Sequence, residues 1–175
     1  MKNIVLIGGS YGIGREITSQ LATNHNIFVA SRTTNEIPEN VTHLTFDVTQ
    51  DDITQLDLPD TIDGLVYCPG SINLKPFKRL SVEAFQEDLN INFLALVKTV
   101  QALLPKLKNS EQASLVFFST VAVKMGMPFH TSVAASKGAR GRPSAGYSVR
   151  RGDNRDRIRQ RPRRAQRGVR ARPGQ

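Results

Sequence analysis

Short apolar runs alternate with longer amphipathic segments between residues 3 and 137. A continuous run rich in β-branched residues is typical of a buried strand, and apolar residues three or four positions apart are typical of a helix with one buried face. This alternation predicts an α/β fold whose parallel sheet is covered on both faces by helices, with right-handed crossovers. The predicted strands are Ile4–Ile7, Ile27–Ala30, Leu44–Phe46, Gly64–Tyr67 and Leu115–Phe118.

Two long helices are predicted between these strands. Gly14–Thr23 follows the first strand, and Ser81–Leu107 is the longest helical region. Ser81 is the expected N-cap of the second helix, and Pro105 is expected to kink or end it. A short helix is expected within the polar segment Gln50–Pro59. The predicted buried faces are Ile13, Ile17 and Leu21 in the first long helix, and Phe85, Leu89, Phe93, Leu96, Val100 and Leu104 in the second.

The organisation stops after Gly138. Residues 1–138 carry eight Lys and three Arg against 13 acidic residues, whereas residues 139–175 carry 13 Arg, no Lys and two Asp. In the second segment Gly and Pro are scattered and apolar residues are isolated. Too little apolar surface can be buried there to offset the loss of chain entropy. We therefore predict one domain over residues 1–138 and a disordered Arg-, Gly- and Pro-rich tail over residues 139–175.

The expected location follows from what the chain lacks. A single cysteine, Cys68, cannot form an internal disulfide and fits a reducing compartment. The apolar run Ile4–Ile7 is too short for a signal peptide, and no apolar stretch approaches the ~20 residues that span a bilayer. No motif indicates a metal site. We expect a cytoplasmic protein without a membrane span.

A glycine-rich turn, residues 8–14, lies between the first predicted strand and the first predicted helix. Glycines permit a tight turn and let backbone N–H groups approach a pyrophosphate at the positive end of a helix. Because the turn directly follows the first strand, it favours nucleotide binding over simple packing of helix on sheet. The expected cofactor contacts in the turn are Gly8, Gly9, Ser10, Tyr11, Gly12, Ile13 and Gly14.

These features resemble the short-chain dehydrogenase/reductase family over residues 3–138. Its Thr-Gly-x-x-x-Gly-x-Gly turn is matched at three glycines, with Gly8 in the Thr place. The resemblance implies a Rossmann-like, doubly wound sheet that binds a nicotinamide dinucleotide and is incomplete at its C-terminal side. The other family marks, in chain order, are Asp47-Val48, Gly70 where the family has Asn-Asn-Ala-Gly, Asn92, Ser119-Thr120 and Lys137.

The end of the second strand favours NADP(H) as cofactor, with NAD(H) as the alternative. NAD-binding proteins place an acidic residue there to bind the ribose 2′-OH, whereas this chain has Ser31-Arg32. An arginine can pair with a 2′-phosphate, and an exposed loop arginine is the alternative. By resemblance, Asp47 and Val48 contact the adenine, and a strand terminator or helix cap is the alternative for Asp47. Gly70 and Lys137 complete the expected cofactor contacts.

The resemblance implies an active site built from Asn92, Thr120 and Lys137. In the family the asparagine holds a water, a serine polarises the carbonyl, and the lysine binds the nicotinamide ribose and lowers the pKa of a tyrosine that transfers the proton. Thr120 stands at the serine place, with Ser119 as the second candidate. The tyrosine place, four residues before the lysine, is Val133, which has no proton to give. We therefore expect little or no turnover.

Other side chains near the missing tyrosine are weaker candidates for the proton donor. His130 has a suitable pKa, but it falls in a loop where a solvent-facing role is the alternative. The side chain of Ser132 should point in a different direction from that of residue 133. Tyr11 and Tyr67 border the expected cofactor cleft without occupying the catalytic position, and Tyr147 would require ordered structure in the tail.

The tail has two interpretations. Its abrupt start indicates translation in a shifted reading frame, which reading the gene beyond codon 139 in the other two frames would test. The alternative is an anchor for nucleic acid or an acidic membrane, because 13 Arg attract phosphates non-specifically. No specific nucleic-acid partner is expected. The helix that builds the family's usual homo-oligomer cannot be recognised in the sequence after Gly138, so we do not expect that oligomer here.

Together these patterns predict an NADP(H)-dependent oxidoreductase acting on a small-molecule carbonyl or alcohol substrate. The chain is expected to be a divergent, truncated copy with impaired catalysis. A non-catalytic protein that binds or senses NADP(H) is the first alternative, and an Arg-rich nucleic-acid binder is the second.

Overall fold

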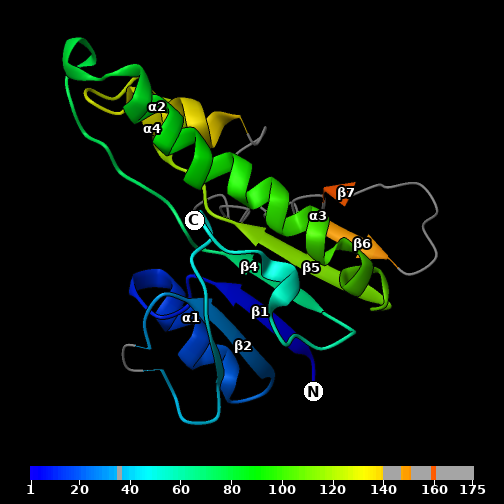
Figure 1. Ribbon diagram of the computed structural model, residues 1–175. Helices are drawn as coiled ribbons and strands as arrows, with labels where there is room; N and C mark the ends of the chain where they lie inside the picture. Colours follow the sequence, from blue (N-terminus) through cyan, green and yellow to red (C-terminus); the bar gives the residue numbers. More distant parts are fainter. Residues whose placement is uncertain (35–36, 140–146, 151–158, 161–175) are drawn as a thin grey trace, which may run out of the picture.

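Seven strands form one sheet in the order β3-β2-β1-β4-β5-β6-β7 (Figure 1). The computed structural model describes residues 1–34, 37–139, 147–150 and 159–160. Strands β1 to β5 pair in parallel, which confirms the predicted doubly wound α/β fold, and β6 and β7 pair antiparallel. The strands are β1 Asn3–Ile7, β2 Asn26–Ser31, β3 Thr42–Thr45, β4 Gly64–Tyr67, β5 Gln112–Phe117, β6 Tyr147–Arg150 and β7 Arg159–Gln160.

Helices connect the parallel strands. The α-helices are α1 Gly12–Ala22, α2 Val82–Leu89, α3 Ala95–Lys108 and α4 Thr131–Gly138. The shorter turns are η1 Ile53–Gln55, η2 Phe77–Arg79, η3 Asn90–Leu94 and η4 Val121–Val123. Within the described ranges, no helix combines the length and the apolar character needed to cross a bilayer.

Alternating strand residues build a separate core on each face of the sheet. Val5 and Leu65 point to the face covered by α3, where they pack with Leu103. Leu6 and Val66 point to the opposite face, which carries α1. Side chains of successive strand residues point to opposite faces, so one buried run can supply both cores. The continuous apolar runs of β1 and β4 are explained by this double coverage.

Helix α1 turns a partly different face to the sheet from the predicted one: Ile17 and Leu21 pack against the core as predicted, but Ile13 does not. Gly14, Thr18 and Ala22 are its buried residues, whereas Ile13 is 66% exposed. The Thr18 hydroxyl donates to the main-chain oxygen of Gly9 at 3.0 Å. Small residues on this face let the helix axis approach the sheet more closely than isoleucine and leucine would. The prediction of Ile13 as a core residue is therefore wrong.

The long helical region is continuous but changes its winding. Figure 1 shows α2, η3 and α3 as one long helix that crosses the sheet, with α4 beside α2. Its middle segment, Asn90–Leu94, is a π-helix, a form that often marks functional sites. The buried residues ahead of α3 are polar, Asp88 and Asn92, instead of the predicted Phe85 and Leu89. The helix also runs through Pro105 to Lys108 rather than ending there.

Part of the segment predicted to be disordered is a strand. Tyr147–Arg150 pairs antiparallel with β5, placing Val149 opposite Ala113 in the core. The rings of Tyr147 and Phe117 lie 5.3 Å apart between centroids. The prediction is therefore wrong for residues 147–150 and for the short β7, because alternating residues and the unpaired edge of β5 supply the missing stabilisation. The rest of the predicted tail lies outside the described residues.

Candidate active site

The glycine-rich turn runs from the carboxyl end of β1 to the first residues of α1. Gly8 and Gly12 have φ values of 74° and 54°, which L side chains rarely adopt. A Cβ on Gly14 would lie 2.2 Å from the main-chain oxygen of Gly8, so position 14 has no room for a side chain. No side chain caps the N-terminus of α1, and its first turn carries no acidic residue. Its amides and positive dipole end are therefore available to an anion.

The remaining residues of the turn face different surroundings. Ser10 is buried, and its hydroxyl shares a 3.3 Å hydrogen bond with the hydroxyl of Thr33. This bond joins the turn to the segment after β2. Tyr11 and Ile13 are 81% and 66% exposed, so they lie on the outer side of the turn.

The ends of β2 and β3 bring Ser31, Arg32 and Asp47 to one edge of the sheet. The Ser31 hydroxyl donates to the Thr33 main-chain oxygen at 2.8 Å, and Arg32 is exposed. The hydroxyl and amide of Thr49 donate to Asp47 Oδ1 at 2.7 and 2.9 Å and lower the pKa of that carboxyl. The charge of Arg32 lowers the Asp47 pKa further. Asp47 thus terminates its strand in a turn and also lies within electrostatic reach of Arg32.

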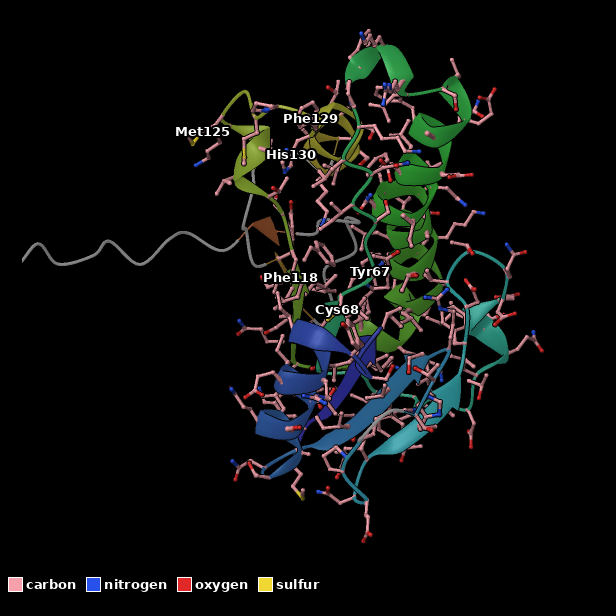
Figure 2. The ribbon with its side chains drawn as sticks, turned by 90° about the vertical axis from the view of Figure 1, so that its left-hand side faces the viewer. Tyr67, Cys68, Phe118, Met125, Phe129 and His130 are labelled. Carbon is pink, nitrogen blue, oxygen red and sulfur yellow. The ribbon has the colours of Figure 1, made fainter. Side chains whose placement is uncertain are left out.

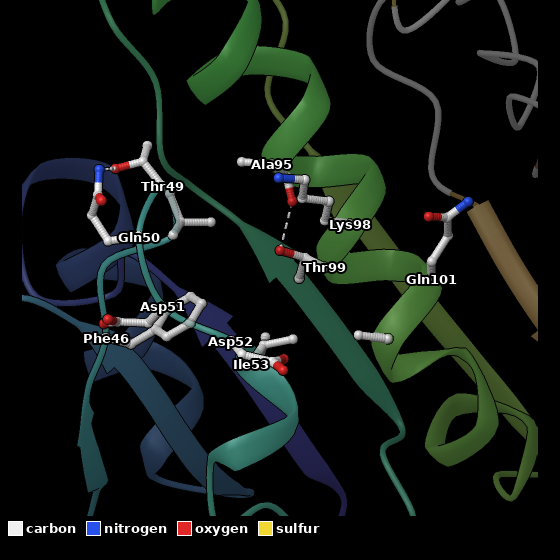
Figure 3. Close-up of a pocket in the computed structure, with 12 residues that line it drawn as sticks. Phe46, Thr49, Gln50, Asp51, Asp52, Ile53, Ala95, Lys98, Thr99 and Gln101 are labelled. Atoms are coloured by element: carbon white, nitrogen blue, oxygen red, sulfur yellow. Dashed lines mark hydrogen bonds between the residues drawn. The ribbon is translucent and has the colours of Figure 1, made fainter.

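Val48 lies beside a cavity of about 580 Å³ between the segment after β3 and helix α3 (Figure 3). Figure 3 shows Thr49 and Gln50 on one side of the cavity and Thr99 on the other. The Thr99 hydroxyl donates to the Ala95 main-chain oxygen at 2.8 Å and is therefore not directed to a ligand.

Asn92, Gly70 and Lys137 converge at the carboxyl end of β4. A Cβ on Gly70 would lie 3.1 Å from Asn92 Oδ1 and 3.2 Å from Lys137 Nζ. Asn92 is fully buried in the π-helical segment, and Lys137 comes from the last turn of α4. Three residues far apart in the sequence therefore meet where the sequence predicted an active site.

Thr120 is placed differently from these three residues. Its hydroxyl accepts the amide of Ala122 at 3.3 Å and so caps the turn Val121–Val123. The buried hydroxyl of Ser119 has no hydrogen-bond partner among the described residues. Of the two hydroxyls, that of Thr120 is used in a cap, whereas that of Ser119 makes no hydrogen bond within the described residues.

Two of the side chains considered as alternative proton donors, His130 and Tyr67, are hydrogen-bonded to main-chain oxygens. Val133 itself is buried one turn before Lys137. His130 is the N-cap residue of α4, about 10 Å along the axis from Lys137 at 1.5 Å per residue. Its Nδ1 donates to the Pro128 main-chain oxygen at 2.7 Å. The Tyr67 hydroxyl donates to the main-chain oxygen of Ile91 at 2.7 Å.

Figure 2 shows that the segment before α4 is separated from the end of β4. Met125, Phe129 and His130 lie on the segment before α4, away from Tyr67 and Cys68 at the end of β4. Phe129 has a φ of 66°, a strained value for a bulky residue.

Cys68 is half-buried between the end of β4 and the glycine-rich turn. Its Sγ would be 3.2 Å from a Cβ on Gly14, and burial raises the pKa of its thiol to about 12. Because the thiolate is the nucleophile, the thiol is unreactive at neutral pH. Cys68 is therefore a packing residue of the turn.

We expect iodoacetamide at pH 8 to alkylate Cys68 about 10³-fold more slowly in the folded chain than in guanidinium chloride, because the unfolded thiol regains an ordinary pKa near 8.5. Mass spectrometry of timed samples follows this single site. Equal rates in the two conditions would show that the thiol is accessible and ionised in the fold.

Two residues of the site, Ser71 and Asp88, were not predicted from the sequence. Ser71 directly follows Gly70, and its hydroxyl bonds to Asp88 and Asn92. Asp88 precedes Asn92 by four residues, a spacing that places both on one helix face. The spacing from Asn92 could have indicated Asp88 as a site residue, but acidic residues in a helix normally face solvent.

Comparisons with known proteins agree with this geometry. A family model described as short chain dehydrogenase matches residues 2–142. Human retinol dehydrogenase 8 is 28% identical over 154 residues, covering 78% of this chain and 50% of that protein. The chain thus spans about half the length of this relative.

Solved structures show the same fold. A short-chain dehydrogenase/reductase from Saccharomyces cerevisiae aligns with a TM-score of 0.71 at 24% identity, covering 80% of this chain and 62% of that one. A putative short chain dehydrogenase from Escherichia coli CFT073, complexed with NADPH, aligns with a TM-score of 0.71 at 25% identity, covering 79% and 67%.

Proposed function

Because the chain belongs to the short-chain dehydrogenase family, we propose that it binds NADP(H) between the glycine-rich turn and Lys137. One observation carries the proposal: a side chain is excluded at Gly14 by a backbone oxygen, and at Gly70 a Cβ would come within 3.1–3.2 Å of Asn92 Oδ1 and Lys137 Nζ. Both glycines follow adjacent strands, β1 and β4, at the carboxyl edge where open α/β sheets bind ligands.

The proposed cofactor contacts follow the cleft from one end to the other. The uncapped amides of α1 suit the pyrophosphate, with Gly8–Gly14 as the turn around it. Ser31, Arg32, Asp47 and Val48 are proposed for the adenosine half. Gly70, Asn92 and Lys137 are proposed for the nicotinamide half.

The proposed chemistry is the interconversion of a carbonyl and an alcohol. Bound NADPH supplies the hydride in such a reaction. Lys137 holds the nicotinamide ribose, and a hydroxyl from Ser119 or Thr120 polarises the carbonyl. Val133 supplies no proton, so we propose that turnover by this chain is impaired.

Val133 also favours a second function, binding of NADP(H) without catalysis. The two functions share the cofactor site and differ only in turnover. Titration of the full chain with NADPH and NADH, followed by nicotinamide fluorescence, tests what they share, and a carbonyl reduction assay then separates them. Absence of binding to either nucleotide would overturn both.

We expect Arg32→Ala to weaken NADPH binding by about 10- to 150-fold and to leave NADH binding unchanged, because a charge-assisted bond to the 2′-phosphate contributes roughly 1.5–3 kcal/mol. Isothermal titration with each nucleotide measures the difference. Arg79→Ala, which removes an exposed arginine from η2, is the matched control. Equal losses for both nucleotides would contradict the proposed role of Arg32.

A further inference from the structure

Asp88 is a buried carboxylate with no place in the function proposed so far. It is 1% exposed, and it is the only acidic or basic side chain among the buried polar residues of the described ranges. One of its oxygens, Oδ2, has no hydrogen-bond partner among those residues. A buried charge is strongly unfavourable unless other groups compensate for it. The groups around Asp88 therefore indicate what it stabilises.

A closed set of hydrogen bonds joins Asp88 to Asn92 through Ser71. The Ser71 hydroxyl donates to Asp88 Oδ1 and accepts from Asn92 Nδ2 at 2.8 Å. The second Asn92 Nδ2 hydrogen goes to the Asp88 main-chain oxygen at 2.9 Å, and Asn92 Oδ1 accepts the Ser71 amide at 3.3 Å.

The direction of this chain of bonds is set at the carboxylate. An ionised carboxylate can only accept, so the single hydroxyl hydrogen of Ser71 points to Asp88. The Ser71 oxygen must then accept from Asn92, which turns the Asn92 amide oxygen toward the main chain of the loop after β4. Through Ser71, the Asp88 carboxylate therefore reinforces the two main-chain bonds that orient the Asn92 side chain.

The oriented amide oxygen lies next to Lys137. Asn92 Oδ1 and Lys137 Nζ both lie within 3.2 Å of the point that a Gly70 Cβ would occupy. The network thus has the Asp88 carboxylate at one end and the Lys137 ammonium near the other. Opposite charges joined through a buried polar path attract more strongly than they would in water.

We propose that Asp88 is a positioning residue for the nicotinamide half of the cofactor. Through Ser71 it orients Asn92, and the oriented Asn92 oxygen and the carboxylate charge hold the Lys137 ammonium against Gly70. The inference rests on the proposed NADP(H) site. It assigns Asp88 and Ser71 to the half of that site near Lys137 and leaves the adenosine half independent of them.

The test compares two ligands on the full chain. NADPH occupies both halves of the site, whereas adenosine 2′,5′-bisphosphate lacks the nicotinamide half. We expect Asp88→Asn and Ser71→Ala to weaken NADPH binding at least tenfold and to change bisphosphate binding less than twofold. Ser71→Thr keeps the hydroxyl and should restore NADPH binding to within about threefold of the original chain.

A matched control is Glu87→Gln, which removes the exposed carboxylate of the residue next to Asp88 in the chain. It should leave both affinities unchanged. Circular dichroism verifies that each variant is folded. If Asp88→Asn fails to fold, the comparison of Ser71→Ala with Ser71→Thr still tests the inference.

Two results overturn the inference while the proposed function stands. One is unchanged NADPH binding in Ser71→Ala, and the other is an equal loss of both ligands in a folded variant. If the original chain binds neither ligand, the proposed function itself fails, and the inference fails with it.

Discussion

Replacing Val133 with tyrosine is expected to raise the rate of carbonyl reduction by about 10²- to 10⁴-fold, the range that a positioned general acid contributes. Position 133 lies one helical turn before Lys137 on α4, so both side chains lie on one face of the helix. The ammonium would lower the pKa of the new phenol toward the working pH, which increases its capacity to transfer a proton. Steady-state oxidation of NADPH with a panel of small aldehydes and ketones measures the gain.

The matched control for this variant is Val133→Phe. Val133 is buried, so both aromatic side chains require the same adjustment of the surrounding packing, and only tyrosine carries the hydroxyl. NADPH binding by each variant shows whether the cleft is intact. If the tyrosine variant binds NADPH but turns over no faster than the phenylalanine variant, the proposed arrangement of Lys137 and position 133 is incorrect.

Gly14→Ala is expected to abolish detectable NADPH binding and to lower the free energy of unfolding by about 1–3 kcal/mol, the range for overpacking a close contact. The new methyl group would lie 2.2 Å from the Gly8 main-chain oxygen, and a backbone atom cannot rotate away as a side chain can. Helix α1 must therefore move off the turn, which displaces the amides proposed to bind the pyrophosphate. Nucleotide titration and guanidinium denaturation measure the two effects.

Gly126→Ala serves as the control for Gly14→Ala. A Cβ at position 126 meets no atom within 4 Å, and Gly126 does not have a positive φ. The control should keep both stability and binding. Normal NADPH affinity in Gly14→Ala would show that the close approach of helix and turn is not needed for the cofactor site.

The parallel strands could be predicted from the sequence because one effect, burial of both faces of a strand, produces each continuous apolar run. β1 and β4 are covered on both faces, so their apolar residues are continuous and easily recognised. The need for glycine in the turn could also be predicted, because the contact that leaves no room for a side chain at Gly14 is made within that turn, to Gly8.

The errors came from contacts between distant segments. Ile13 has helical spacing, yet the close approach of α1 to the sheet selects Gly14 and Thr18 for the interface. Asp88 is an acidic residue in an amphipathic helix, and the hydroxyl that bonds its buried carboxylate comes from Ser71, 17 positions away. Val149 is apolar within a basic segment, and the edge of β5 decides its conformation. None of these partners can be identified from local spacing.

The sheet order also determines how the chain can fold during synthesis. β1 leaves the ribosome first but lies between β2 and β4. Its pairing with β2 needs residues up to 31, whereas its other edge stays open until β4, which ends at Tyr67, has been made. During that interval the nascent chain exposes an apolar strand edge, the kind of surface that chaperones protect. Synthesis from the N-terminus therefore allows this sheet to grow outward from β1, its first strand.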